Sequence, residues 1–431
     1  MPQIVVLGAG IAGISVGYHA NKIKKECVIY EAKERFGGLL DSFNISGFRF
    51  DNAVHLSFTN NSYVRNLFDQ TPYIQHYPAA YNFENGTWLK HPVQNNLFPL
   101  STQEKIEAIK SFIQRPPATD TDDYYEWLIQ QYGEVIAKRF PCKYTRKYWT
   151  ISPSHLSTKW IGNRMYRPTL DEVLLGAMTS ETLNAYYAQE MRYPKIGGYR
   201  SFLTSLAKTC TIKVNKKAIY IQPKLKYIEF EDTERVYYEN LISSIPLPEL
   251  LTIIEGVPTE IQRIAQNLCA TSIALVSIGF ARPDVPNHLW FYIYDEDLLA
   301  ARAYSPSLKS PDNVPTGCSS LQFEIYYSKY KPLNMNKNTL IEHVMRSLET
   351  MKIANKEDIL ITDYRIVPYA NVIFDKEMIK IRKLIIDYLQ NIGIEVVGRF
   401  GEWDYLWSDQ SLLSGKKAIE KIFPDLLDNI L

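Results

Sequence analysis

The fold of this chain is decided near its start, by the stretch Ile4-Val5-Val6-Leu7-Gly8-Ala9-Gly10-Ile11-Ala12-Gly13. Its first four residues form an apolar run without alternation, which is typical of a strand buried on both faces of a parallel sheet. The glycines that follow are spaced G-x-G-x-x-G: Gly8 permits a tight turn, Gly10 lets backbone approach a pyrophosphate and Gly13 lets the next helix pack closely. A helix beginning at Ile11 would direct its free N–H groups at that pyrophosphate. The stretch therefore predicts a dinucleotide site.

A second strand and an acidic residue extend the pattern. Cys27-Val28-Ile29-Tyr30 is another apolar run, and it ends on Glu31. A carboxylate at that offset accepts hydrogen bonds from the hydroxyls of an adenosine ribose and would repel a 2′-phosphate. Strand, glycines, helix, second strand and acid together predict a dinucleotide site far more specifically than the glycines alone.

The continuation separates a flavin dinucleotide from a nicotinamide dinucleotide. Glu34-Arg35-Phe36-Gly37-Gly38-Leu39 has the pattern Glu-Arg-x-Gly-Gly, which resembles the flavoprotein group of amine oxidases, protoporphyrinogen oxidase and UDP-galactopyranose mutase. In that group the glycine pair lets backbone contact the FAD pyrophosphate and ribityl chain. An ordinary Gly-Gly turn is the alternative. Because the pair lies where the first motif predicts it, we expect FAD as the cofactor.

The composition is that of an ordinary globular protein, with 431 residues, 46% hydrophobic, 22% charged and a net charge of +1. So low a charge argues against a nucleic acid or an anionic membrane held by bulk electrostatics. The five cysteines form no C-x-x-C pair, so neither a disulfide framework nor a metal site is indicated, and reduced thiols suit the cytosol. No apolar run approaches the roughly 18 residues of a membrane span, and a strand beginning at residue 4 leaves no room for a signal peptide. We expect a cytoplasmic protein without an integral membrane segment.

Periodicity divides the rest of the chain. Ile106, Ile109 and Phe112 repeat at helical spacing. The strand-like runs are residues 273–280, 289–294 and 321–327. In the last run the apolar residues 321, 323, 325 and 327 share one face, with Gln322 and Glu324 on the other. We expect an α/β fold in which a discontinuous FAD-binding Rossmann-like domain (1–75, 190–260 and 390–431) carries a helical insertion (100–190) and a separate, mainly antiparallel β-sheet substrate domain (76–99 and 261–389).

Three local elements near the predicted cofactor site are also read from pattern. Residues 193–199 are predicted as a loop that opens a helix at Ser201. Residues 395–401 are predicted as a strand ending in glycine, and a helix is expected from about Gln410 to Ile422. The last two repeat the logic of the opening stretch, a strand end and a helix N-terminus directed at cofactor oxygens.

Beyond the cofactor motifs, the chain resembles UDP-galactopyranose mutase, more the eukaryotic-like branch and its bacterial polysaccharide-cluster relatives than the standard bacterial enzyme. The motifs that carry the resemblance are Pro92-Val93-Gln94-Asn95-Asn96, Trp160-Ile161-Gly162-Asn163-Arg164, Arg302 before Tyr304-Ser305-Pro306, and residues 398–405. The resemblance implies that N5 of reduced FAD attacks the anomeric carbon of UDP-galactopyranose and expels UDP. The sugar then opens, recloses as a furanose and recaptures UDP, without net oxidation. Such an enzyme serves lipopolysaccharide or other surface polysaccharide synthesis.

By motif, the resemblance places two diphosphate-binding arginines at Arg164 and Arg302 and two diphosphate-binding tyrosines at Tyr369 and Tyr405. Guanidinium forks suit this role because they match phosphate oxygens bidentately. A salt bridge is the alternative for each arginine, and packing is the alternative for Tyr369. Gln94 would lie on the nucleotide side of the pocket and Trp149 near the uridine.

His55, in the loop beside the flavin, is the third residue expected in the catalytic centre, with a polar loop-closing role as its alternative. The resemblance and the motifs together give one set of expected FAD contacts. These are Gly8, Gly10, Ala12, Gly13, Glu31, Ala32, Arg35, Gly37, Gly38, Leu39, His55, Val214, Gly398, Arg399, Gln410 and Ser411.

Three positions depart from the family pattern. Ala53-Val54 replaces the glycine pair before the loop histidine, Thr145 replaces an asparagine near the uridine, and the tyrosine expected a few residues after Arg302 has no match around residues 306–308. These departures leave the sugar nucleotide open.

Two other functions are therefore carried as alternatives. One is an FAD oxidoreductase of the protoporphyrinogen oxidase or amine oxidase type, and the other is a flavin-stabilised binding protein without turnover. NAD(P)H is a candidate reductant, although the sequence shows no second dinucleotide fingerprint. The oligomeric state is left open.

Overall fold

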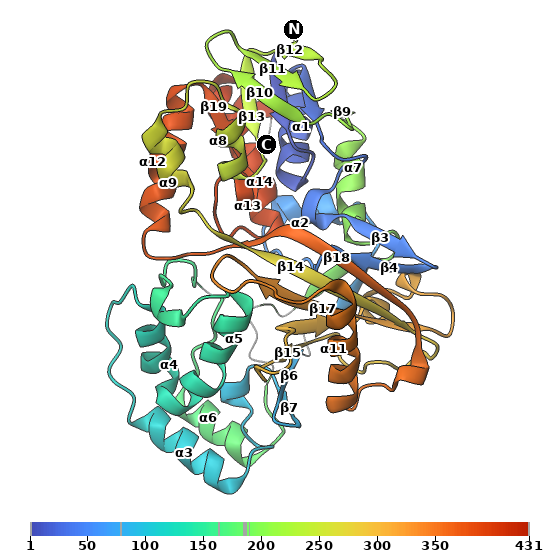
Figure 1. The fold of residues 1–431 in the computed structure, drawn as a ribbon, viewed down its shortest axis with the longest axis vertical. Helices are drawn as coiled ribbons and strands as arrows, with labels where there is room; N and C mark the ends of the chain where they lie inside the picture. Colours follow the sequence, from blue (N-terminus) through green and yellow to red (C-terminus); the bar gives the residue numbers. More distant parts are fainter. Residues whose placement is uncertain (1, 78–79, 163, 184–187, 189, 430–431) are drawn as a thin grey trace.

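The computed structural model describes residues 2–77, 80–162, 164–183, 188 and 190–429. Its first sheet is parallel throughout and begins with the predicted strand (Figure 1). In spatial order its strands are β19 (Ile394–Val396), β13 (Asn240–Ser243), β1 (Ile4–Leu7), β2 (Cys27–Tyr30) and β9 (Thr211–Lys213). The bounds of β1 and β2 and the start of helix α1 (Ile11–Lys22) are those predicted from sequence. Apolar runs without alternation therefore became the central strands of a buried sheet, as expected.

The second sheet is antiparallel at every pairing except that of β15 with β6. In spatial order its strands are β18 (Ile359–Val372), β14 (Ala270–Phe280), β17 (Ser319–Tyr327), β16 (Arg302–Tyr304), β15 (Trp290–Ile293), β6 (Ala80–Glu84) and β7 (Thr87–Lys90). The long strands β14 and β18 run across the middle of the molecule, and helix α11 (Lys337–Thr350) packs against this sheet (Figure 1). The mixed α/β fold with a separate, mostly antiparallel sheet is as predicted.

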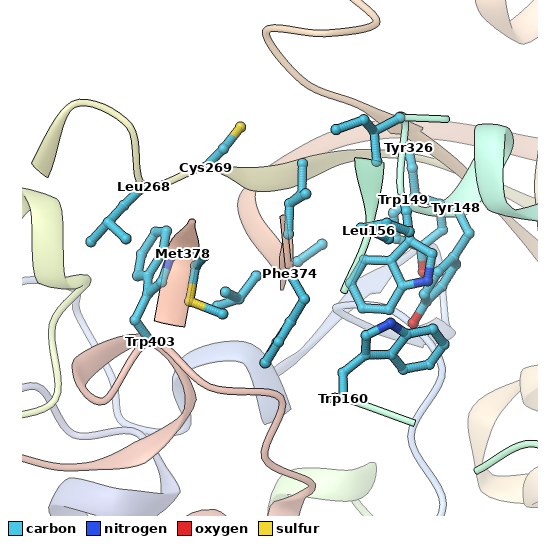
Figure 2. Close-up of a cluster of buried hydrophobic side chains, with 14 of the residues drawn as sticks. Tyr148, Trp149, Leu156, Trp160, Leu268, Cys269, Tyr326, Phe374, Met378 and Trp403 are labelled. Atoms are coloured by element: carbon cyan, nitrogen blue, oxygen red, sulfur yellow. The ribbon is translucent and has the colours of Figure 1, made fainter. Parts of the chain in front are cut away.

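Helices gather below the parallel sheet at one side of the antiparallel one (Figure 1). They are α3 (Thr102–Ile113), α4 (Tyr124–Arg139), α5 (Pro141–Tyr148) and α6 (Leu170–Met178). Residues of this group share one buried core with strands β1 and β2 and with Trp403. Figure 2 shows part of that core, with Phe374 in the middle. Tyr148, Trp149 and Trp160 lie on one side of it, and Met378 and Trp403 lie on the other. The domain boundaries themselves stay a prediction.

Smaller elements complete the fold. The remaining strands are β3 (Ser42–Ile45) with β4 (Phe48–Asp51), β5 (Tyr73–His76) with β8 (Met191–Pro194), and β10 (Ala218–Gln222), β11 (Tyr227–Phe230) and β12 (Arg235–Tyr237). The remaining helices are α2 (Ser62–Phe68), α7 (Thr204–Ala207), α8 (Leu247–Ile253), α9 (Thr259–Ala265), α10 (Pro306–Lys309), α12 (Met378–Asn391), α13 (Gly398–Gly401) and α14 (Ser408–Ile422). Among the described residues, no helix combines the length and apolarity that crossing a membrane requires.

Two local predictions were wrong, and a third was correct to within two residues. Tyr193 and Pro194 are not loop residues, because they pair with Ile74 and Tyr73 as the end of β8. The glycine-ended strand stops at Val396, since residues 398–401 turn into α13. The last helix ends at Ile422 as predicted and begins at Ser408, two residues before Gln410, whose side chain accepts the N–H of Trp407 at 2.9 Å. In each case a tertiary partner or a helix cap decided a boundary that periodicity alone had placed too loosely.

Candidate functional site

A cavity of about 760 Å³ runs from the C-terminal end of β1 to the face of β16 and β17. Most of the predicted cofactor residues line it, together with two residues predicted to bind substrate. The predicted residues that line it are Gly8, Gly10, Ala12, Glu31, Ala32, Gly37, Gly38, Leu39, His55, Arg302, Gly398, Arg399, Tyr405 and Ser411. Gly13, Arg35, Gln94, Trp149, Arg164, Val214, Tyr369 and Gln410 do not line it. Their predicted roles stay predictions.

Backbone forms the end of the cavity beside β1. Gly8 has a φ of +95°, and a Cβ there would lie 2.4 Å from Oγ of Ser244. A Cβ on Gly10 would meet nothing within 4 Å, so this glycine borders open space at the N-terminus of α1. Gly37 has a φ of +125° and donates its N–H to the carbonyl of Ala9 at 2.9 Å, which joins the two glycine motifs. Close backbone approach and unpaired helix N–H groups are what a pyrophosphate requires.

Glu31 lies where a ribose would follow the pyrophosphate. Its carboxylate accepts the N–H groups of Ala9 at 2.7 Å and Lys33 at 2.9 Å, and it lines the cavity. Each carboxylate oxygen carries two lone pairs, so accepting sites are left for ribose hydroxyls. Both glycine motifs and Glu31 therefore fit an adenine dinucleotide.

The neighbouring wall is formed by residues of the same turn as Val214, but not by Val214 itself. Val214 is 38% exposed, whereas Lys216 and Ala218 line the wall. The chain turns at Asn215, which has a φ of +54°, and Lys216 donates its N–H to the carbonyl of Glu31 at 2.8 Å. Asparagine is one of the non-glycine residues that adopt a positive φ most often, so this residue type suits the turn.

At its other end the cavity is lined by the loop of residues 53–55 and by Tyr148, Arg302 and Tyr326, and we call this part of the cavity the ring end. Ala53 has a φ of +88°, a conformation that glycine adopts without strain. Nδ1 of His55 lies 3.1 Å from the carbonyl of Ala53. Burial holds the pKa of His55 well below its ordinary value, and the cations Lys309, Arg399 and Arg302 lower it further. His55 is therefore a neutral hydrogen-bonding group at physiological pH.

Arg302 lies at the ring end, in an ion pair with the fully buried carboxylate of Glu324. It also donates to the hydroxyl of Tyr326 at 2.9 Å, and its guanidinium lies 5.4 Å from the ring centroid of Tyr148. Glu324 further accepts the N–H of Val54 at 2.7 Å, which connects Arg302 to the loop of residues 53–55. The salt bridge weighed as an alternative for Arg302 is present, and the same guanidinium lines the cavity.

Arg164 does not meet Arg302 in the cavity. It donates to the carbonyls of Trp160 and Tyr405, each at 2.8 Å, and its guanidinium lies 4.9 Å from the ring centroid of Tyr405. Tyr405 in turn lies 2.9 Å, hydroxyl to hydroxyl, from Tyr148. The two predicted arginines therefore contact different members of this pair of tyrosines, Arg302 at Tyr148 and Arg164 at Tyr405.

The other residues predicted to bind substrate contact protein groups and do not line the cavity. Gln94 is 8% exposed and donates to the carbonyl of Tyr166 at 3.3 Å. Trp149 packs against Trp160 (Figure 2) and also against Tyr405. Tyr369 packs against Phe400 and Trp403, and its predicted role stays a prediction.

Two further predicted residues also point elsewhere. Thr145 is buried and donates to the carbonyl of Pro141 at 2.7 Å, so the proton of its hydroxyl is already engaged within the protein. Arg35 binds Asp41 at 2.8 Å, outside the cavity wall.

Sequence reasoning missed several residues of the ring end, namely Tyr148, Trp290, Tyr292, Tyr326, Asn371 and Trp407. One signal for them existed. In β17 the apolar face was identified from alternation, and Glu324 and Tyr326 lie on the opposite face, where they meet Arg302. Polar residues that alternate with a core face on a fully buried strand were therefore the clue. Within the described residues there is no group of three or more His, Cys, Asp or Glu side chains that could hold a metal ion.

Comparison with known proteins agrees with this geometry. Residues 6–71 match the family model described as NAD(P)-binding Rossmann-like domain. A protein from Exiguobacterium sp. 255-15 assigned as a protoporphyrinogen oxidase shares the fold, with 14% identity, a TM-score of 0.74 and coverage of 98% of this chain and 99% of that chain. A putrescine oxidase variant from a redesign of cofactor binding also shares it, with 14% identity, a TM-score of 0.71 and the same coverage. The class is thus a Rossmann-like dinucleotide-binding domain combined with an antiparallel sheet.

Within that class, one solved structure is similar to this chain over nearly its full length. The solved structure of a reduced UDP-galactopyranose mutase superposes with a TM-score of 0.92 and 25% identity, over 98% of this chain and 96% of that chain. The resemblance to UDP-galactopyranose mutase drawn from the sequence motifs is therefore confirmed over nearly the whole chain.

Proposed function

We propose that this protein is an FAD-dependent mutase that interconverts UDP-galactopyranose and UDP-galactofuranose, or a closely related pair of sugar nucleotides. The observation that carries the proposal is Arg302, a cation flanked by the tyrosines Tyr148 and Tyr326 at the end of a dinucleotide cavity. A sugar diphosphate needs such a cation, whereas the neutral or amine substrate of an oxidase does not. The full-length likeness to a UDP-galactopyranose mutase supports the same reading.

FAD would be held by the backbone of the two glycine motifs, by the N-terminus of α1 and by Glu31. When bound and reduced, it would supply the nucleophilic nitrogen. The chain would supply position and charge.

Arg302 would bind the diphosphate and stabilise the negative charge on UDP as it leaves. Tyr405 would offer its hydroxyl to the same group, and Arg164 would hold Tyr405 in place through its carbonyl. His55, kept neutral, would offer a ring nitrogen beside the reacting centre without repelling a cationic sugar. Because no acid or base of the chain has to be the nucleophile, the absence of a catalytic triad from the predicted motifs is consistent with this chemistry.

Three finer statements belong to the same proposal. The reductant would be NAD(P)H, the product would enter surface polysaccharide synthesis, and the enzyme would act in the cytoplasm. An FAD oxidoreductase is the second candidate, favoured by the fold shared with the two oxidases.

The deciding experiment incubates dithionite-reduced protein with UDP-galactofuranose and resolves UDP-galactopyranose by chromatography, beside the oxidised protein. Conversion by the reduced sample alone is the expected result. Arg302→Ala should lower kcat/KM at least about 100-fold, the typical effect of removing a group that stabilises transition-state charge.

Two controls accompany this variant. Arg302→Lys keeps a charge beside Glu324, and Arg263→Ala removes an exposed arginine whose partner is Glu260. The proposal fails if the protein binds FAD but not UDP, and oxidation of an amine or porphyrinogen in that case would establish the second candidate.

A further inference from the structure

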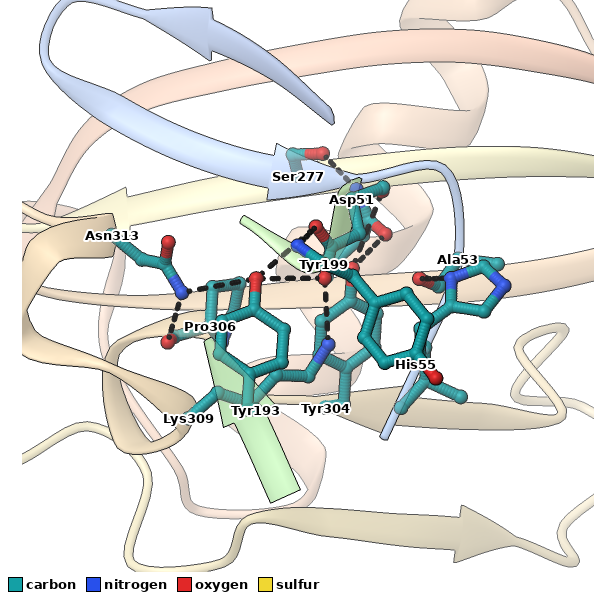
Figure 3. Close-up of polar contacts among 12 residues, drawn as sticks. Asp51, Ala53, His55, Tyr193, Tyr199, Ser277, Tyr304, Pro306, Lys309 and Asn313 are labelled. Atoms are coloured by element: carbon teal, nitrogen blue, oxygen red, sulfur yellow. Dashed lines mark hydrogen bonds and ion pairs between the residues drawn. The ribbon is translucent and has the colours of Figure 1, made fainter. Parts of the chain in front are cut away.

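Asp51 is the hub of a buried polar network behind the ring end (Figure 3). Its carboxylate forms an ion pair with Nζ of Lys309 at 3.0 Å, and both side chains are almost completely buried. The hydroxyl of Tyr193 lies 2.9 and 3.1 Å from its two oxygens, and the N–H of Tyr199 donates to one of them at 3.2 Å. Strand β4, strand β8, helix α10 and the turn at residue 199 thus meet at one carboxylate.

This hub lies directly before the loop that lines the cavity, residues 53–55, which we call the flavin-facing loop. The carbonyl of Asp51 accepts the N–H of Ala53 at 2.9 Å, and the hydroxyl of Tyr304 lies 3.3 Å from the same carbonyl. Tyr199, bonded to Asp51 through its N–H, has its ring 5.2 Å from that of His55. Each contact fixes the start of the loop or packs against it.

The flavin-facing loop needs such an anchor because of its backbone. Ala53 has a φ of +88°, where a Cβ costs on the order of 1 kcal/mol that glycine avoids. The sequence has Ala53-Val54 where the resemblance led us to expect two glycines. A strained conformation persists only when its surroundings over-determine it.

We propose that Asp51 and Lys309 are positioning residues: their buried ion pair anchors the flavin-facing loop, holds Ala53 in its left-handed conformation and sets two charges that partly offset each other beside this wall of the cavity. The inference rests on the FAD of the proposed function and not on its sugar nucleotide. Removing either partner would leave one buried charge beside the ring end.

The first test loosens the hub without leaving an unpaired charge. Tyr193→Phe deletes one hydroxyl donor to Asp51, and we expect FAD affinity, measured by quenching of flavin fluorescence, to fall about tenfold, with a changed visible flavin spectrum. Ala53→Gly in the same chain should restore most of that affinity, because glycine adopts this conformation without the strain that the anchor has to offset.

The matched control is Tyr132→Phe, which deletes an equally buried tyrosine hydroxyl that donates to the carbonyl of Tyr166 at 2.7 Å, away from the cavity wall. It should leave FAD affinity unchanged. Equal losses in the two variants, or no recovery with Ala53→Gly, would overturn the inference as a positioning claim.

The second test uses the charges. Lys309→Met leaves Asp51 unpaired and should lower the midpoint potential of the bound flavin, because a negative charge opposes added electrons. Asp51→Asn leaves Lys309 unpaired and should raise it. Shifts in the same direction would show a purely structural effect and overturn the claim that the charges of Asp51 and Lys309 offset each other.

If these two variants do not fold, the Tyr193→Phe comparison decides alone. A wild-type chain that binds no FAD would overturn the proposed function and this inference with it, whereas wild-type binding with no effect of Tyr193→Phe would overturn only the inference.

Discussion

The two ends of the cavity are built from different materials. The dinucleotide end is formed largely by backbone within the first forty residues, supplied by Gly8, Gly10, Gly37 and the N-terminus of α1, together with the carboxylate of Glu31. The ring end is formed by the loop of residues 53–55 and by side chains from α5, β15, β16, β17 and the segment after α13. Backbone sites leave a local signature because only glycine fits them, whereas side-chain sites depend on how distant strands pair. The contrast predicts that changes at the two ends will fail in different ways.

The largest expected effect separates folding from binding within the first glycine motif. A Cβ on Gly13 would lie 2.0 Å from the carbonyl oxygen of Gly8, so Gly13→Ala should lower the free energy of unfolding by more than about 3 kcal/mol. Gly10 has a φ of −72° and open space around it, so Gly10→Val should fold normally. Its side chain would nevertheless occupy the cavity, and FAD affinity should fall at least about 100-fold.

Urea denaturation without cofactor measures the first effect, and flavin titration measures the second. Comparable stability losses in Gly10→Val and Gly13→Ala would contradict the claim that one glycine serves the helix packing and the other the ligand.

The next effect is a pH dependence that differs between the interior of helix α1 and the ring end. His19, fully buried in α1, has its pKa lowered to about 4, mainly by burial. The unfolded chain therefore binds a proton that the folded chain excludes, and stability, complete above pH 6.5, should fall by up to about 3 kcal/mol as the pH approaches 4. His19→Gln should flatten this slope in urea titrations at pH 7 and pH 4.5.

His55 at the ring end should behave differently in an activity assay. Burial and nearby cations keep its pKa well below 6.5, so the rate of the reduced enzyme should show no inflection near pH 6.5 from this group. An inflection there that disappears in His55→Gln would show that His55 titrates in the working enzyme.

The same contrast explains what could be predicted. Strands β1 and β2 and the start of α1 were located to the residue, because their sequence signal is local. Glu324 was recognised as belonging to the polar face of its strand, but its partners Arg302 and Val54 follow from a strand order that periodicity does not reveal. Arg164 and Trp149 were placed in the substrate pocket by resemblance. In the structure both side chains contact Tyr405 and neither lines the cavity, and their predicted roles stay predictions.

The smallest expected effect tests the contact between Arg164 and Tyr405. Arg164 holds Tyr405 by its carbonyl at 2.8 Å and does not line the cavity, so Arg164→Met should raise KM for the sugar nucleotide about tenfold, well short of the loss in Arg302→Ala. Arg164→Lys should recover little, because one ammonium cannot reproduce a planar fork that reaches two carbonyls. A loss as large as that of Arg302→Ala, with FAD still bound, would mean that Arg164 reaches the diphosphate itself. The ring end would then have to close around its substrate, with Tyr405 moving aside.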